Sequence, residues 1–247
     1  MGQSAVYVPS VSSTMDLALE EAHRGASEGT IVVADAQSAG RGRFDRPWVS
    51  PPGSALYLSF LLRPKLAWLG QLNMVATLAI LQAVHLETGL AARIKWPNDV
   101  EIGGRKLAGV LIDSAMRDGE VEHAIVGVGL NTTLNPDEHP EIATIATSLS
   151  RELQTRVERL PLLRALLLEI EQLYERVKAG DSLVLEWSKH VSTIGQSVRV
   201  SWPGDAAKKV MDEEGVAEGV DEDGSLLLRR NDGSVTRLVA GEVSLRS

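Results

Sequence analysis

Hydrophobic residues along the chain change their pattern near residue 194, which divides the sequence into a longer first part and a shorter second part. In the first part, continuous apolar runs of strand length predict strands that are buried in a sheet. These runs lie at Thr30–Ala36, Ser54–Pro64 and Glu120–Asn131, and the short β-rich segment Ala5–Val8 predicts one more strand.

Helical spacing of apolar residues predicts helices in the same part of the chain. They lie at residues 12–26, 69–89, 160–180 and 182–190. The first helix can be capped by Ser12, Ser13 or Thr14, because a side-chain oxygen there accepts from a free N–H. Gly89 is placed to end the second helix, and Pro161 is compatible with the first turn of the third.

The remaining segments complete the predicted fold. Residues 92–115 predict a strand, a Pro-Asn-Asp turn, a Gly-Gly hairpin and a second strand, whereas residues 132–158 begin as a loop. From Ile194 onward, short strands separated by Gly and Asp turns predict a small β-barrel of roughly 50 residues. We therefore expect an α+β protein with a large domain at residues 1–193 and a small β domain at residues 194–247.

The composition is that of a globular protein, with 44% hydrophobic and 23% charged residues among 247. The formal charge of −8 disfavours a general nucleic-acid binder, which is usually basic. The absence of cysteine excludes disulfides and is compatible with a reducing cytosol. No signal-peptide pattern and no apolar stretch near ~20 residues occur, so we expect neither secretion nor a membrane span.

A basic, glycine-rich loop follows the predicted strand at Thr30–Ala36. Its core, Gly40–Trp48, reads GRGRFDRPW and holds two glycines and three arginines. Glycine lets backbone N–H groups approach an anion, and arginine offers a planar fork to carboxylate or phosphate. The loop is either an anion-binding loop at the end of a strand or a solvated surface loop. It matches neither the P-loop nor the G-x-G-x-x-G pattern.

A second candidate lies around Lys106, where a Gly-Gly hairpin enters the apolar strand LAGVLID. Because lysine is rarely buried, Lys106 either reaches solvent along the strand or directs a point charge at a phosphate or carboxylate. Upstream, KWPND places Asn98 and Asp99 in a turn. These two residues either only form the turn or bind a ribose, an amine or a metal-bound water.

Two further motifs have both a structural and a functional interpretation. Ser12–Thr14 is explained by helix capping, but a helix N-terminus is also a polar ligand site. In VGVGLN, Asn131 ends a strand beneath two glycines, which indicates either close packing on a ligand or simple strand termination. The five histidines show no zinc-site spacing, and G-x-S-x-G is absent, so neither a zinc enzyme nor a serine hydrolase is predicted.

Taken in order, these motifs resemble those of the biotin protein ligases. The matching segments are SST, Q-x-A-GRGR-x-x-R-x-W-x-S-P-x-G-x-x-LYLS, KWPND, GRKLAG, VGVGLN and the C-terminal β segment, which together span nearly the whole chain. The resemblance implies a mixed β-sheet flanked by helices, related to class II aminoacyl-tRNA synthetases, and then an SH3-like barrel. It points to the monofunctional form, without the N-terminal DNA-binding domain of some members.

The resemblance also implies a two-step reaction. Biotin and ATP first give biotinyl-5′-AMP and pyrophosphate, with Mg²⁺ expected beside ATP. A lysine of a biotin carboxyl carrier domain then takes up the biotinyl group. The implied protein is a cytoplasmic monomer or weak homodimer that binds neither DNA nor membranes.

By the same resemblance, Lys106 is the catalytic lysine that bridges the biotin carboxylate and the α-phosphate, and Arg43 assists it. The residues expected to bind biotin are Ser13, Thr14, Gln37, Gly40, Arg41, Gly42, Arg43, Lys106 and Gly109. Those expected to bind ATP are Arg43, Arg46, Trp48, Asn98, Asp99, Lys106 and Asn131.

The sequence departs from the family pattern at two positions. Met15 stands where the family often has asparagine, and Asp45 stands where the loop usually has a third glycine. We expect the loop to close over the adenylate and exclude water, and Asp45 to remove some of its backbone freedom.

Three alternative interpretations remain. A lipoate or octanoate ligase shares the fold, although the double Arg-Gly loop and KWPND favour biotin. A nucleic-acid-binding barrel is disfavoured, because Asp205–Asp223 carries eight acidic side chains against Lys208 and Lys209. An inactive ligase is disfavoured because the charged motif residues are all retained.

Overall fold

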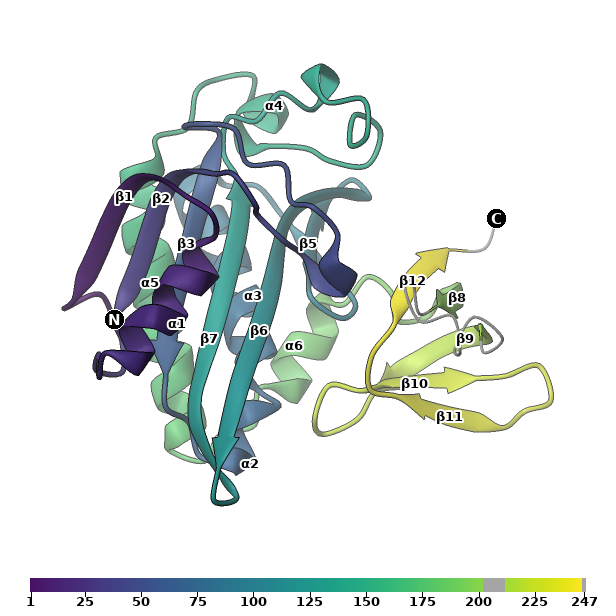
Figure 1. The fold of residues 1–247 in the computed structure, drawn as a ribbon. Coiled ribbons are helices and arrows are strands. Elements are labelled where there is room, and N and C mark those ends of the chain that lie inside the picture. Colours follow the sequence, from purple (N-terminus) through teal and green to yellow (C-terminus); the bar gives the residue numbers. More distant parts are fainter. Residues whose placement is uncertain (202–211, 246–247) are drawn as a thin grey trace.

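The computed structural model describes residues 1–201 and 212–245. Its larger part is a seven-stranded mixed sheet with the strand order β1-β2-β3-β7-β6-β5-β4 (Figure 1). Only β1 and β2 run parallel; the other neighbouring pairs are antiparallel. The strands are β1 (Ala5–Val11), β2 (Ile31–Gln37), β3 (Ala55–Leu62), β4 (Arg93–Lys95), β5 (Asp99–Ile102), β6 (Arg105–Arg117) and β7 (Glu120–Asn131).

Helices cover both faces of this sheet, as Figure 1 shows. They are α1 (Thr14–His23), α2 (Leu66–Leu69), α3 (Leu72–Thr88), α4 (Leu149–Leu153), α5 (Arg159–Lys178) and α6 (Val184–His190). On one face, α1 packs Met15, Ala18 and Ala22 against the sheet. On the other face, α3 and α5 pack against each other, and both helices contact the sheet. Strand β3 is buried along its whole length, which explains its continuous apolar run.

The segment Leu66–Thr88 spans 23 residues and is apolar enough, by length and composition, to cross a membrane. We did not expect this from the sequence. In the structure most of α3 is buried against the sheet and α5, so its apolar surface belongs to the core of the fold.

Local signals in the sequence place several element ends. The Ser13 side chain accepts from the Met15 N–H and caps α1, and Gly89 ends α3 in the left-handed region at φ 72°. The strand predicted at residues 5–8 extends to Val11, because it pairs with β2 over that length. Within the predicted loop at residues 132–158, the structure forms α4, which is capped by Ser148.

The smaller part is a five-stranded sheet with the order β11-β10-β9-β8-β12. Its strands are β8 (Ser197–Ser201), β9 (Glu213–Val220), β10 (Leu226–Arg229), β11 (Val235–Leu238) and β12 (Glu242–Leu245). Within the described ranges, β11 and β12 each pair on one side only, so the described strands do not close into a barrel. It lies beside the β4–β5 end of the large sheet (Figure 1), where the buried Trp96 donates its indole N–H to the Gly224 carbonyl at 2.9 Å.

The acidic stretch Asp205–Asp223 is only partly described, since Asp205, Lys208 and Lys209 lie outside the described residues. Several of its described carboxylates pair with arginines of the same sheet. The pairs are Asp212–Arg199, Glu213–Arg230, Glu218–Arg229, Asp221–Arg237 and Asp223–Arg237.

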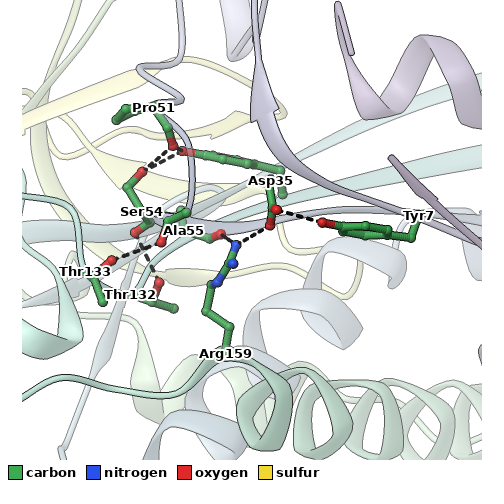
Figure 2. A network of polar contacts seen from close by, with 10 residues as sticks. Tyr7, Asp35, Pro51, Ser54, Ala55, Thr132, Thr133 and Arg159 are labelled. Atoms are coloured by element: carbon green, nitrogen blue, oxygen red, sulfur yellow. Dashed lines mark hydrogen bonds and ion pairs between the residues drawn. The ribbon is translucent and has the colours of Figure 1, made fainter. Parts of the chain in front are cut away.

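A polar network ties α5 to the large sheet (Figure 2). Asp35 accepts from the Tyr7 hydroxyl at 2.6 Å and from Arg159, the first residue of α5, at 2.8 Å. The Tyr7 hydrogen bond and the Arg159 charge hold the pKa of Asp35 below its usual value, although burial opposes them. In the same view, Ser54 lies beside Thr132 and Thr133, whose backbone N–H groups donate to its carbonyl.

Candidate active site

A cavity of about 250 Å³ opens between the loop after β2, the β4–β5 turn, strands β6 and β7 and the start of β12. The sequence-predicted site residues that line it are Ser13, Thr14, Gln37, Arg41, Gly42, Arg43, Arg46, Trp48, Asn98, Asp99, Lys106, Gly109 and Asn131. Gly40 is the predicted residue that does not line the cavity.

One end of the cavity is built from neutral hydrogen-bonding groups, Ser13, Thr14 and Gln37, which we call the ring end. Ser13 and Thr14 are buried at the start of α1. The Gln37 amide oxygen accepts from the Thr14 backbone N–H at 2.8 Å and from its hydroxyl at 3.1 Å. Because Thr14 and Gln37 bind each other, their remaining donors and acceptors have fixed directions.

The floor of the cavity is bare main chain of β6 and β7. A Cβ atom on Gly127 would lie 2.7 Å from the Met15 sulfur, and one on Gly129 would lie 2.7 Å from the Trp48 ring. Met15, the residue that departs from the family pattern, therefore fills space directly above a glycine. The Trp48 Nε1 is buried and has no hydrogen-bond partner in the described part of the chain.

The cationic part of the cavity wall, which we call the anion end, holds Lys106, Arg41, Arg43 and Arg46, and Arg41 also reaches Asp16 at the start of α1. Lys106 Nζ lies 2.7 Å from an Asp99 oxygen and 5.0 Å from the centre of the Trp48 ring. Arg43 donates to the Gly241 carbonyl at 3.0 Å and to the Asn98 side chain at 3.4 Å. Burial lowers the pKa of Arg43, and the nearby charges of Asp99 and Glu242 offset this only in part.

The two outer arginines of this end pair with carboxylates. Arg41 lies 2.6 Å from Asp16 and 3.6 Å from Asp113, and Arg46 lies 2.5 Å from Glu242 of β12. Burial works to lower the pKa of Arg41, but the hydrogen bond and charge of Asp16 outweigh it, so this pKa is raised. Each of these cations is held in place by a carboxylate.

The loop that carries these arginines has an unusual backbone. Phe44 and Asp45 have φ values of 56° and 54°, in the left-handed region that favours glycine. Aspartate tolerates this region better than most residues. The position where the family pattern has glycine is thus a position where this chain needs a glycine-like conformation.

Sequence reasoning missed the segment at residues 134–147, which forms an apolar wall of the cavity through Leu134, Ile142, Ile145 and Ala146. Its backbone pairs with Lys106, whose N–H donates to Ile145 at 2.8 Å and whose carbonyl accepts from Thr147 at 2.9 Å. Asn131 donates to the Thr147 carbonyl at 3.0 Å, so its amide secures this wall. Gly241, Glu242 and Val243 also line the cavity and were not predicted, because they lie far from the rest of the site in the chain.

No group of three or more His, Asp or Glu side chains suited to a metal ion occurs among the residues that the structure describes. The arrangement instead suits a small molecule with a polar ring at one end and phosphate or carboxylate groups at the other. Neutral donors and acceptors recognise the first, and lysine and arginine bind the second.

This fold and this cavity are those of a ligase that activates and transfers acyl groups. Residues 7–131 match the model of the biotin/lipoate A/B protein ligase family, and residues 193–246 match the biotin protein ligase C-terminal domain. The chain belongs to the biotin/lipoate A/B protein ligase family.

Relatives narrow the comparison to biotin. The chain is 34% identical to the bifunctional ligase/repressor of Bacillus subtilis over 99% of the chain and 75% of that protein. It is 34% identical to the biotin–[acetyl-CoA-carboxylase] ligase of Mycobacterium tuberculosis over 92% of the chain and 83% of that protein. The biotin protein ligase of Aquifex aeolicus, solved with biotin and ATP, superposes with a TM-score of 0.81 at 28% identity and covers 99% of both chains.

Proposed function

We propose that this protein is a biotin protein ligase, which activates biotin as biotinyl-5′-AMP and transfers it to a lysine of a biotin carboxyl carrier domain. One observation carries the proposal: a neutral, directional ring end and a lysine- and arginine-rich anion end share one cavity. Biotin has a ureido ring and a carboxylate, and ATP supplies the phosphates.

In the first step, a biotin carboxylate oxygen attacks the α-phosphorus of ATP, and the bond to the β-phosphate oxygen breaks to release pyrophosphate. Two anions must approach each other, so positive charge at the point of attack lowers the barrier. Lys106 occupies that position, with its ammonium group held by Asp99 at 2.7 Å. Arg43 and Arg46 bind the phosphates, and Arg41 closes the loop over the ligand.

The remaining assignments follow the geometry. Ser13, Thr14 and Gln37 bind the ureido ring. Gly109 lies beside the biotin carboxylate, because a Cβ atom on it would lie 3.1 Å from the Lys106 side chain. Trp48, Asn98 and Asp99 face the nucleotide, whereas Asn131 acts through the wall at Thr147. Mg²⁺ arrives with ATP, because it usually keeps several waters and binds through the substrate phosphates.

In the second step, the carrier lysine attacks the acyl carbon of biotinyl-5′-AMP, an amide forms, AMP leaves and the amine gives up a proton. We infer a cytoplasmic enzyme that acts as a monomer or weak homodimer. We place the domain boundary near Ile194 and interpret the C-terminal sheet as an SH3-like barrel, on a catalytic domain related to class II aminoacyl-tRNA synthetases.

A lipoate or octanoate ligase is the second candidate, because the family model includes lipoate ligases. The ring end favours biotin. A dithiolane ring or an alkyl tail offers no N–H or carbonyl to the buried Ser13 and Thr14 or to the half-buried Gln37, and these groups would lose partners on desolvation.

Pyrophosphate exchange tests the proposal, with biotin, lipoate and octanoate supplied in parallel to the same protein. We expect ³²P-pyrophosphate to enter ATP only when biotin is present. Exchange driven by lipoate or octanoate but not by biotin contradicts the assignment and supports the second candidate.

A further inference from the structure

Next to the ring end, four side chains from four separate segments form a continuous chain of hydrogen bonds, which we call the relay. Ser59 of β3 donates to Thr14 at 2.8 Å, and Thr14 donates to Gln37 at 3.1 Å. The Gln37 amide nitrogen then donates to Ser50 at 3.3 Å, and Ser50 donates to the Trp48 carbonyl at 2.9 Å. Thr14 and Gln37 line the cavity, whereas Ser59 and Ser50 do not.

The direction of this relay is determined by one group that can only donate. The backbone N–H of Thr14 points at the Gln37 side chain at 2.8 Å, so Gln37 must present its oxygen there. Its amide nitrogen consequently faces Ser50, which must accept. The proton of Ser50 is then free to bind the Trp48 carbonyl, which can only accept.

The relay ends at the base of the basic, glycine-rich loop Gly40–Trp48, which we call the arginine loop. Gly40 and Trp48 are the two stems of this loop, and the Trp48 N–H donates to the Gly40 carbonyl at 2.8 Å. A Cβ atom on Gly40 would lie 2.7 Å from Ser50 Oγ and 2.9 Å from Gln37 Nε2. The main chain therefore passes directly over the relay, and this close approach requires glycine at residue 40.

We propose that Ser50 is a positioning residue that couples occupancy of the ring end to the position of the arginine loop. The proposal rests on the proposed function. A ureido ring that bonds to Gln37 and Thr14 alters the hydrogen bonds that Ser50 shares with Gln37. Because Ser50 also holds the Trp48 carbonyl, the change reaches the loop stem and hence Arg41, Arg43 and Arg46.

The matched variants are Ser50→Ala and Ser54→Ala. Ser54 belongs to the same β2–β3 connection and is also buried, but its hydroxyl bonds to Pro51 and Tyr57 and not to Gln37 or Trp48. Tyr57 also lies beside Ser50, so Ser54→Ala tests whether a change at Tyr57 alone is enough. Trypsin reports on the loop, since it can cleave after Arg41 and Arg43, whereas Pro47 blocks cleavage after Arg46. Pyrophosphate exchange gives the KM values for biotin and ATP separately.

For wild type and Ser54→Ala, we expect saturating biotin to change the rate of cleavage at Arg41 and Arg43. For Ser50→Ala, we expect this change to disappear, the ATP KM to rise about five-fold and the biotin KM to stay within about two-fold, the effect of one hydrogen bond. If Ser50→Ala does not fold, Ser50→Cys keeps the volume and removes most of the hydrogen bonding.

Three results overturn the coupling: a wild type that binds biotin with no change in cleavage, a Ser50 variant that responds as wild type does, or an unchanged ATP KM. A wild type that shows neither biotin binding nor biotin-dependent exchange contradicts the proposed function instead.

Discussion

The two ends of the cavity are held by different kinds of contact. At the ring end, Ser13, Thr14 and Gln37 are neutral: Thr14 and Gln37 bind each other, and Ser13 accepts from the Met15 N–H. At the anion end, Lys106 and Arg46 are partly exposed and pair with Asp99 and Glu242. The neutral hydrogen bonds fix the directions of the donors and acceptors. The ion pairs hold lysine and arginine side chains whose carboxylate partner can be exchanged for a phosphate.

The energies of these contacts explain the difference. A buried donor or acceptor left without a partner costs about 1–3 kcal/mol, so the ring end rejects a ligand of the wrong polarity. A partly exposed ion pair contributes only about 0–1 kcal/mol, so a phosphate can replace the carboxylate at little cost. Selectivity for the ring and affinity for phosphates are thus built by separate means.

Among changes at the anion end, we expect the largest loss of activity from Lys106→Ala. We expect kcat for pyrophosphate exchange to fall about 10²- to 10³-fold, because charge at the α-phosphate loses its main partner. Thermal unfolding should change little. Lys65→Ala, at a lysine over Trp68 outside the cavity, is the control. A Lys106→Ala enzyme with a near-normal rate would show that the role is wrongly assigned.

The matching change at the ring end is Gln37→Leu, which removes a donor and an acceptor at similar size. We expect the biotin KM to rise about ten- to a hundred-fold, with a smaller change in the ATP KM. Steady-state exchange with each substrate varied in turn measures both. If the two KM values rise equally, the ends do not act separately and the comparison fails.

A smaller effect is expected from Glu242→Gln, which releases Arg46 from its partner on β12. If Glu242 competes with phosphate, the ATP KM falls by up to about five-fold, and the biotin KM stays constant. The measurement is exchange kinetics at low and high salt, since screening should reduce the difference. A higher ATP KM would mean that the Arg46–Glu242 pair instead holds the small sheet in the position that ATP binding needs.

The Tyr7–Asp35–Arg159 network provides an ion pair outside the cavity, for which no exchange with substrate is expected. Because the pKa of Asp35 is lower in the fold than the ordinary pKa of an aspartate, Asp35 stabilises the protein at pH values above that ordinary pKa. This contribution is lost as the pH falls through the folded pKa.

We therefore expect Asp35→Asn to lower the thermal midpoint at pH 7 and to reduce the loss of stability between pH 7 and pH 3. Both KM values at pH 7 should match wild type. A changed KM would show that the network also positions the site.

The sequence predicted most of the fold, because many signals are local. Ser13 caps α1, Gly89 ends α3, and Gly103 and Gly104 adopt the positive φ values that their hairpin needs. What it missed depends on distant contacts. Arg43 reaches Gly241 across 198 residues, and the wall at residues 145–147 becomes visible only as a strand-like neighbour of Lys106. Periodicity and turn residues carry no information about such pairings.

The indole of Trp48 has a practical consequence. Its ring lies against Gly129 at the base of the loop, whereas Trp96 and Trp187 are fully buried with their N–H groups bonded to Gly224 and Thr77. Movement of the loop changes the polarity around Trp48 and leaves those two unchanged. Because the chain has five tryptophans, intrinsic fluorescence compared with that of a Trp48→Phe variant can follow the loop in real time in unlabelled protein.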